Sequence, residues 1–300
     1  MSKKIWIGTI INRDLEVFNQ IEKFLKTNYA NKLSIVSFLK KDGSFSRKYF
    51  RKKFKKYPIS FLIVKLQSTP SNQIIYNAIK SYCPNIPLLN SLKSVSASES
   101  RRKTFKFIEE NFKQLYFPRS YFSLNTAYEA CKQGIPLIIK FDNHNDPFIS
   151  KDDRIIGIAK STDELMKLVH NYNPSILFFQ EYLGKFDIVY KTYVIDEFMV
   201  CITSHNRLQS HKLSQIELIH IRVPIDEQLK AKIEQIGEKL EMTVFGVDYI
   251  VKNGKQYIVD VNDFPSFRNI PEAVSLISDY IYNLLTYSEK FIKLPVSINE

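Results

Sequence analysis

The sequence predicts a mixed α/β and α+β protein with an N-terminal parallel α/β layer, a central flap and a C-terminal antiparallel sheet. Short apolar runs alternate with amphipathic stretches over the first ninety residues, which is typical of a parallel sheet with helices. A serine-rich stretch, SLKSVSASES, then indicates a junction. The dipeptide Asn253-Gly254 is a strong hairpin signal near the C-terminus. We expect three units that span residues 1–95 (a Rossmann-like, substrate-binding layer), 96–185 and 186–300.

Periodicity predicts the elements of the first two units. Helices are expected where apolar residues recur with helical spacing behind a capping residue, and strands where short apolar runs lie between polar stretches. The N-terminal strands are expected over Ile5–Ile10, Leu33–Leu39, Ile59–Leu66 and Ile86–Leu89, with helices over Ser46–Lys56 and Pro70–Tyr82. The central unit should contain helices over Arg101–Lys113, Asn125–Gln133 and Asp163–Tyr172, and strands over Pro136–Lys140, Arg154–Lys160 and Ile176–Leu183.

The last unit is predicted to be built from two hairpins. One turns at Asp196-Glu197 and the other at Asn253-Gly254. Two amphipathic helices should pack against the resulting sheet. The strands are expected over Phe186–Ile195, Phe198–Ser204, Val244–Val251 and Gln256–Val261, and the helices over Ile225–Leu240 and Pro271–Leu285.

Composition indicates a globular protein that does not use a membrane. Hydrophobic residues make up 44% and charged residues 25% of the chain. No run reaches the roughly 18 apolar residues of a membrane span, and the N-terminus turns polar too early for a signal peptide. We therefore expect a cytoplasmic protein with no membrane partner. The odd number of widely spaced cysteines predicts buried reduced thiols at Cys83, Cys131 and Cys201.

Positive charge is concentrated between Lys40 and Lys56. This segment contains nine basic residues and one acid, while the whole chain has a formal net charge of +12. Such a cluster attracts polyanions. Three interpretations stay open, namely a solvated helix face, a site for a phosphorylated small molecule and a nucleic-acid surface. The absence of a glycine-rich or aromatic RNA-binding signature disfavours nucleic acid.

The second hairpin carries the strongest chemical signal. Asp248 and Asp260 lie about equally far from the Asn253-Gly254 turn, so the two carboxylates should face each other across the ladder. Asn262 follows Asp260 by two residues and should point to the same face. Spacing alone also fits two exposed acids, but apolar β sequence surrounds both, where an unpaired charge is costly. We expect these oxygens to hold Mg²⁺ together with substrate phosphates.

Four segments, taken in order, resemble the ATP-grasp superfamily. The ending FGVDYIVKNGKQYIVDVNDFPSF is similar to its metal hairpin, and three segments upstream match it in the same order. The resemblance implies an ATP-grasp fold with ATP as co-substrate and Mg²⁺ as cofactor. Lys140, in PLIIK, and Lys191, in DIVYKTYVI, would act as catalytic cations on the phosphates. Gln180, Glu181 and Leu183, in LFFQEYL, would bind the nucleotide at the hinge.

Three features resemble one branch of that superfamily, the inositol 1,3,4-trisphosphate 5/6-kinases, also called inositol-tetrakisphosphate 1-kinases. They are the VDVNDFPSFRNIPE loop with Phe264, the strand ending IVKL with Lys65, and the helix start ESRRKTF, in which Arg102 matches best and Arg101 is possible. The resemblance implies that Arg102 binds the nucleotide. The expected partner is a small polyanion, an inositol phosphate. The pattern assigns its binding to Lys65, Arg207, His211 and Arg268.

The loop after Lys140 departs from the family pattern. Most ATP-grasp proteins have glycines there that close backbone amides over the phosphates, whereas FDNHNDPFISKDD has none. Either side chains such as His144 contact the phosphates, or nucleotide binding is weakened. We expect His144 to bind substrate, the alternative being a solvated loop histidine.

We therefore predict a kinase that transfers the γ-phosphate of ATP to an inositol phosphate hydroxyl, with no dedicated base. Two alternatives stay open. A carboxylate-amine ligase, such as a glutamate-adding enzyme, would share the fold and the ATP site but release phosphate. A non-catalytic nucleotide-binding module would bind Mg-ATP without turnover.

Overall fold

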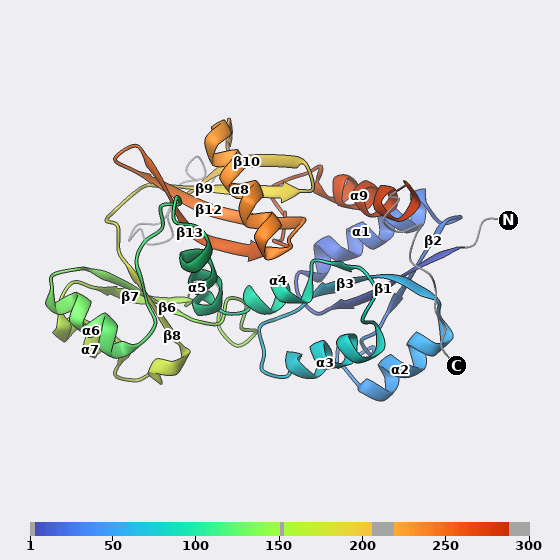
Figure 1. The fold of residues 1–300 in the computed structure, drawn as a ribbon, viewed down its shortest axis with the longest axis horizontal. Coiled ribbons are helices and arrows are strands. Elements are labelled where there is room, and N and C mark those ends of the chain that lie inside the picture. The colour runs from blue at the N-terminus through green and yellow to red at the C-terminus, as the bar shows by residue number, and fades with distance from the viewer. Residues whose placement is uncertain (1–3, 151–152, 206–218, 288–300) are drawn as a thin grey trace.

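The computed structural model describes residues 4–150, 153–205 and 219–287, which form three sheets with flanking helices (Figure 1). The first sheet, in the order β2-β1-β3-β4, has only parallel neighbours, as predicted. Its strands all run in the same direction, so their carboxyl ends lie at one edge of the sheet. The elements are β1 (Ile5–Ile11), α1 (Leu15–Asn28), β2 (Leu33–Ser37), α2 (Arg47–Lys56), β3 (Ile59–Lys65), α3 (Asn72–Tyr82) and β4 (Leu88–Leu89).

The serine-rich stretch after β4 is a helix, which its composition did not indicate. This helix, α4 (Leu92–Ala97), begins at Ser91, whose hydroxyl accepts a hydrogen bond from the backbone N–H of Ser94 at 3.2 Å. The side chains of Ser94 and Val95 are buried. The junction is therefore an ordered connection that leads directly into α5 (Arg101–Asn111).

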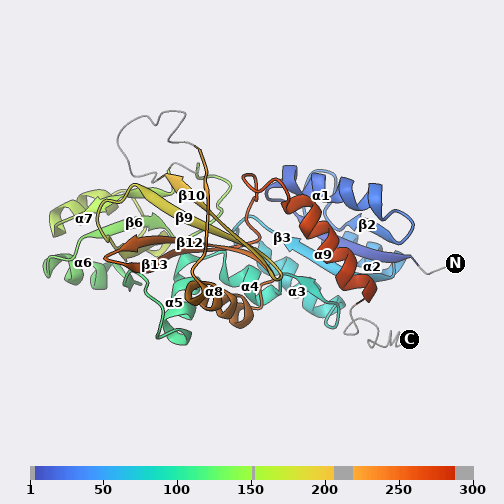
Figure 2. The same ribbon diagram turned by 90° about the horizontal axis from the view of Figure 1, so that it is seen from above.

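The central sheet has the order β5-β8-β6-β7 and is antiparallel. Helices α6 and α7 pack on it, and their apolar side chains form one buried cluster with β6, β7 and β8. Figure 2 shows this unit at the end of the molecule opposite the first sheet. Its elements are β5 (Ser120–Tyr121), α6 (Leu124–Lys132), β6 (Leu137–Phe141), β7 (Ile155–Ala159), α7 (Thr162–Val169), a 3₁₀ turn over Pro174–Ile176 and β8 (Leu177–Glu181).

The third sheet, in the order β11-β10-β9-β12-β13, is also antiparallel and contains both predicted hairpins. Asn253 and Gly254 have φ angles of 51° and 72°, as a two-residue hairpin turn of this hand requires. Helix α8 covers one face together with the end of α5, which belongs to the preceding stretch of chain. The elements are β9 (Ile188–Ile195), β10 (Phe198–His205), β11 (Arg222–Val223), α8 (Glu227–Leu240), β12 (Val244–Lys252) and β13 (Lys255–Asp263).

The last helix, α9 (Ala273–Tyr287), packs on the first unit as well as on the third sheet. Sequence patterning predicted only the contact with the sheet. Apolar residues of α9 share one buried cluster with α1, β1 and β9. The rings of Tyr29 and Tyr282 stack with their centroids 3.9 Å apart, and the Tyr29 hydroxyl donates to Asp279 at 2.6 Å. The C-terminal helix thus fastens the first unit to the last.

Two expectations from composition can be compared with the structure. The thiols of Cys83, Cys131 and Cys201 are free and buried, as predicted. None of the helices in the described part of the chain combines the length and the apolar character that a membrane crossing requires.

Candidate functional site

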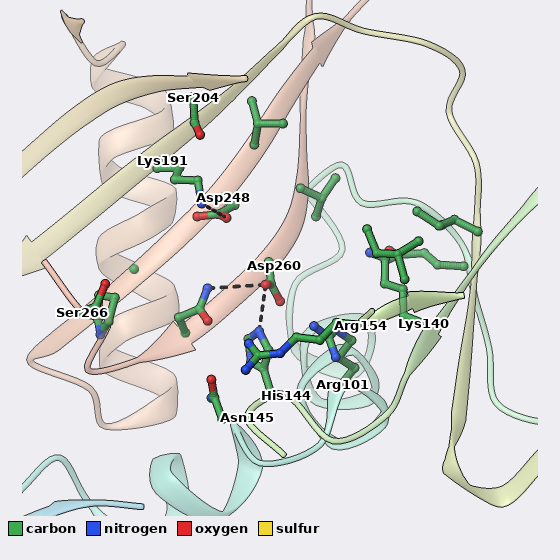
Figure 3. A pocket seen from close by; sticks show the side chains of 18 of the residues that line it. Arg101, Lys140, His144, Asn145, Arg154, Lys191, Ser204, Asp248, Asp260 and Ser266 are labelled. Carbon is green, nitrogen blue, oxygen red and sulfur yellow. Dashed lines mark hydrogen bonds and ion pairs between the residues drawn. The ribbon is translucent and has the colours of Figure 1, made fainter. Parts of the chain in front are cut away.

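A cavity of about 580 Å³ opens between the central and the third sheet, with the carboxyl ends of β1 and β3 at one side. Side chains of the central and third sheets line it together with residues that follow β1 and β3, and Figure 3 shows part of this lining. Ten residues singled out in the sequence line this cavity: Arg101, Lys140, His144, Gln180, Glu181, Leu183, Lys191, Asp248, Asp260 and Asn262.

The oxygen donors of the second hairpin, Asp248, Asp260 and Asn262, converge on one wall of the cavity. We name it the metal wall, after the Mg²⁺ site that the sequence predicts there. Asp248 pairs directly with Asp260 across the ladder, and Gly246 pairs with Asn262, so the expected juxtaposition is confirmed. The amide of Asn262 lies 3.5 Å from the Asp260 carboxylate. Within the described ranges, no three His, Cys, Asp or Glu side chains form a metal-binding cluster. Two carboxylates and one amide oxygen still fit Mg²⁺, because this ion keeps several waters and takes substrate phosphates as ligands.

Two lysines lie near this wall, one on the third sheet and one on the central sheet. Lys191 on β9 pairs with Asp248 in the ladder, and its ammonium lies 3.4 Å from the Asp248 carboxylate (Figure 3). Lys140 on β6 donates to the side-chain oxygen of Gln180 on β8 at 2.9 Å. Burial and the neighbouring Arg101 lower the pKa of Lys140 to about 8, against the opposing effect of Asp260 and Asp248. The side-chain nitrogen of Gln180 is buried without a hydrogen-bond partner, which leaves a donor for a ligand.

His144 reaches the metal wall from the loop after β6. Its ring Nε2 lies 2.8 Å from Oδ2 of Asp260, and its side chain is buried (Figure 3). Burial and Arg101 lower the pKa of His144, against the opposing effect of Asp260. Burial would raise the pKa of Asp260, but His144, Arg101 and Lys140 together lower it, and the carboxylate stays ionised. His144 therefore orients Asp260, an arrangement that leaves the other carboxylate oxygen for a metal.

The glycine-poor loop is tied down at several points. The carboxylate of Asp142 accepts from Ser100 Oγ and from the backbone N–H of Arg102, each at 2.8 Å. The backbone N–H of His144 donates to the backbone carbonyl of Glu99 at 3.0 Å. Asn145 and Ser68 exchange two hydrogen bonds, at 3.1 Å and 3.2 Å. These contacts hold residues 142–145 of the loop in place. Side chains and backbone groups of other segments thus position this part of the loop without glycine.

Arg101 and Arg102 have opposite environments. Arg102, the better sequence match, donates to the backbone carbonyls of Leu177 and Pro174 and is not among the residues that line the cavity. Arg101 lines the cavity and donates to the carbonyl of Phe141 at 2.6 Å. Successive helical residues point about 100° apart, so adjacent arginines cannot share one role. The structure thus gives Arg102 a bracing position and Arg101 the place at the cavity.

The structure also gives Lys65 a different environment from the one expected. Its side chain is 1% exposed and does not line the cavity. Its ammonium lies 3.1 Å from Asp14, 3.4 Å from the carbonyl of Pro265 and 4.7 Å from the ring centre of Phe264. Lys65 therefore joins the start of α1 to the loop after β13, and a direct contact with substrate would require its release from these partners.

Arg13, which sequence reasoning missed, lines the cavity where Lys65 was expected to do so. It follows β1 directly and donates to the carbonyl of Asp263 at 2.6 Å. A signal was present, because ligands of parallel sheets bind beyond the carboxyl ends of strands and Asn12-Arg13-Asp14 follows an apolar run. Gln67, after β3, and Arg154, before β7, are two further cavity residues without a sequence prediction.

The remaining substrate-binding predictions fall away from the cavity or outside the described residues. Arg268 is exposed, lies 3.7 Å from Glu16 and is not among the lining residues. Arg207 and His211 lie outside the described residues.

The chain can be compared with known proteins. No family model matches it. Among curated proteins, it is similar to inositol-tetrakisphosphate 1-kinase of Xenopus laevis, with 28% identity over 75 residues. That segment covers 24% of this chain and 19% of the relative, so the match spans about a fifth of the length of the kinase.

Solved structures match over almost the whole chain. The D-alanine–D-alanine ligase of Bacillus anthracis complexed with ATP has a TM-score of 0.64 at 17% identity, covering 93% of this chain and 96% of the ligase. The RiPP-associated ATP-grasp ligase of Chryseobacterium gregarium, in complex with ADP and a leader and core peptide, has a TM-score of 0.63 at 13% identity, with 94% and 96% covered. The chain has the ATP-grasp fold.

A third solved structure supports the same fold. D-alanyl-alanine synthetase A of Vibrio cholerae has a TM-score of 0.65 at 12% identity and covers 95% of this chain and 98% of its own. Enzymes of the ATP-grasp fold use ATP and Mg²⁺ in general. Hard oxygen donors and buried cations in one cavity are the chemistry that such a nucleotide requires.

Proposed function

We propose that the protein is a Mg-ATP-dependent kinase that transfers the γ-phosphate of ATP to a hydroxyl of a small polyanion, an inositol phosphate. One observation carries the proposal. The cavity combines the oxygen donors of Asp248, Asp260 and Asn262 with the cationic side chains of Arg13, Arg101, Lys140, Arg154 and Lys191. Phosphoryl transfer needs mainly a metal, positive charge and positioning, and little covalent chemistry from the protein.

In this proposal each wall of the cavity has a separate task. Asp248, Asp260 and Asn262 hold Mg²⁺, which would offset charge on the β- and γ-phosphates. Lys140 and Lys191 contact the phosphates, while Gln180, Glu181 and Leu183 bind the rest of the nucleotide. We also propose the division into units over 1–95, 96–185 and 186–300, with the first unit supplying the acceptor side.

The acceptor side is formed by Arg13, which lies beyond β1 and faces the same cavity. A guanidinium offers a planar pair of donors that matches phosphate oxygens. Lys65 contributes here as a positioning residue, because it holds Asp14 and the loop at Pro265 together. The partial likeness to the Xenopus laevis kinase supports a phosphorylated inositol as the acceptor.

A carboxylate-amine ligase is the second candidate, and the whole-chain likeness to ligases favours it. A ligase would use the same metal wall and the same two lysines. It would differ in the acceptor, which would be an amino acid or peptide, and in the release of inorganic phosphate. On the acceptor side the guanidinium of Arg13, whose Nε lies 3.5 Å from Asp14, supports a phosphorylated substrate.

The test is a screen with γ-labelled ATP, Mg²⁺ and two panels of acceptors, inositol phosphates and amino acids. The label and the released phosphate are followed together. We expect label on an inositol phosphate without stoichiometric phosphate release. Phosphate release that depends on an amino acid would replace the kinase with the ligase, and Mg-ATP binding without turnover on either panel would indicate a non-catalytic module.

A further inference from the structure

We propose that a second anion site, separate from the cavity, lies on helix α2 and binds a compact polyphosphorylated small molecule. The site is a hollow of about 430 Å³ at the surface of the first unit. In Figures 1 and 2, α2 lies at the end of the molecule away from β6 and β13, which carry Lys140 and Asp260. The proposal therefore does not depend on the function of the cavity. The hollow is lined by Arg47, Lys48, Arg51, Lys52, Lys55 and Tyr82.

Helical spacing places these cations on one face. Arg47, Arg51 and Lys55 follow one another at intervals of four residues, and Lys48 and Lys52 form the adjacent row. All five are exposed. The opposite face anchors the helix, because Phe50 is fully buried and its ring packs against Phe38 and Tyr82. The five charges are thus held on a rigid support with Tyr82 of α3 at one side.

The charge of α2 is not compensated by an ion pair in the part of the chain that the structure describes. The helix has seven basic residues and no acid, and none of the ion pairs found among the described residues involves it. Asp42, the single acid between residues 40 and 56, accepts hydrogen bonds from Ser44. Like charges four residues apart destabilise a helix, and Arg47 and Lys48 lie at the end where the helix dipole disfavours cations. A bound anion would relieve both effects.

The shape of the site favours a compact ligand over an extended one. A hollow can surround several phosphates of one small molecule, and guanidinium and ammonium groups one turn apart can each hold one. Insertion into a membrane is disfavoured because the apolar face of α2 is already buried in the protein. Single-stranded RNA would need exposed rings for stacking, and the hollow offers one tyrosine.

The experiment measures the binding of inorganic tripolyphosphate to the full-length protein by calorimetry without Mg²⁺, for three proteins. The first is the wild type, and the second is the hollow variant, Lys48→Gln/Lys52→Gln. The matched control is Lys53→Gln/Lys56→Gln, which removes the same charge from the same helix, where both lysines face tyrosine rings and do not line the hollow. Circular dichroism checks that all three proteins are folded.

We expect the hollow variant to bind tripolyphosphate about tenfold more weakly at one class of site. The affinity of the control should change by less than about twofold. Equal weakening in both variants would reduce the site to diffuse attraction and overturn the proposal. So would tripolyphosphate binding in the wild type that the loss of Lys48 and Lys52 leaves unchanged. Tighter binding of single-stranded RNA or of phosphatidylserine vesicles at the same residues would replace the small ligand with a macromolecular partner.

Discussion

Lys140 and Lys65 have the same sequence context, a lysine at the carboxyl end of an apolar strand, but opposite environments. Lys140 lines the cavity, and its hydrogen-bond partner is the neutral amide of Gln180. Lys65 is buried below the cavity, and its partner is the carboxylate of Asp14. The comparison teaches that the same sequence pattern can place a lysine either at the cavity or inside the packing between units. In the proposed function Lys140 contacts a phosphate, whereas Lys65 positions Asp14 and the loop at Pro265.

The metal wall beside Lys140 is where the largest effect is expected. Asp260→Asn keeps the side-chain volume and the contact with His144 but removes the charge from the proposed metal site. We expect Mg²⁺-dependent turnover to fall on the order of 10²–10³-fold, with little change in thermal midpoint. Glu238→Gln, an exposed acid on α8, is the control. Activity within a few-fold of wild type would remove Asp260 from the metal site.

The next prediction separates the two lysines directly. Lys140→Met should lower kcat/KM for ATP by about 10–100-fold, because one charge-assisted contact with phosphate is lost. The exposed Lys132→Met on α6 tests for a general effect of lost charge. Steady-state kinetics with varied ATP provide the measurement. An unchanged response to ATP would show that Lys140, like Lys65, serves only the structure.

A smaller effect is expected on the acceptor side. Arg13→Gln should raise KM for the phosphorylated acceptor about tenfold, because Arg13 lines the cavity, and leave KM for ATP unchanged. Lys65→Met should raise it less than about threefold, since Lys65 acts through Asp14 and the Pro265 carbonyl. If Lys65→Met has the larger effect, the ammonium contacts substrate and the contrast with Lys140 disappears.

The last prediction concerns stability and pH. Burial and Arg13 lower the pKa of Lys65 to about 7, although Asp14 acts in the opposite direction. Below about pH 7 the amine is protonated in both states, and burial of the charge disfavours folding by a constant amount. Between there and the unfolded pKa of about 10.4, the unfolded chain binds a proton that the folded protein does not, so stability rises with pH.

Urea unfolding at pH 7 and pH 9 tests this sign for the wild type and for Lys65→Met. The free energy of unfolding of the wild type should rise relative to the variant by about 1 kcal/mol per pH unit. The difference in free energy of unfolding between the wild type and the variant could instead stay constant or fall as pH rises. Lys65 would then keep its proton when buried, and Asp14 would dominate its environment.

Much of the metal wall could be predicted from the sequence because it is one hairpin. The Asn253-Gly254 turn sets the register as far as Tyr249 and Ile258, and a register shift between Asp248 and Tyr249 then brings Asp248 opposite Asp260. The turn could be predicted, whereas the register shift could not. Periodicity placed Lys191 and Gln180 on strands, the resemblance to the ATP-grasp superfamily singled them out, and both residues line the cavity.

The residues that sequence reasoning misplaced depend on contacts with segments that lie far away in the sequence. Lys65 meets Asp14 and Pro265 only when the first and last units pack together. Arg102 seemed to match the arginine of the family better than Arg101 did. The sequence of the helix alone does not show which of the two faces β8, and in the structure Arg102 does. The glycine-poor loop took its anchors from Ser68 and Glu99, which lie far from it in sequence.

The packing of α9 on α1 also affects how the chain folds during synthesis. The core of the first unit contains side chains from β1 and α1 and, at its other side, from α9, which ends at residue 287. At about 5–20 residues per second, ribosomes need roughly 10–40 s to proceed from the end of β4 to the end of α9. During that time one apolar face of α1 lies open to solvent. Nascent chains of the first unit should therefore bind holding chaperones until the last helix emerges.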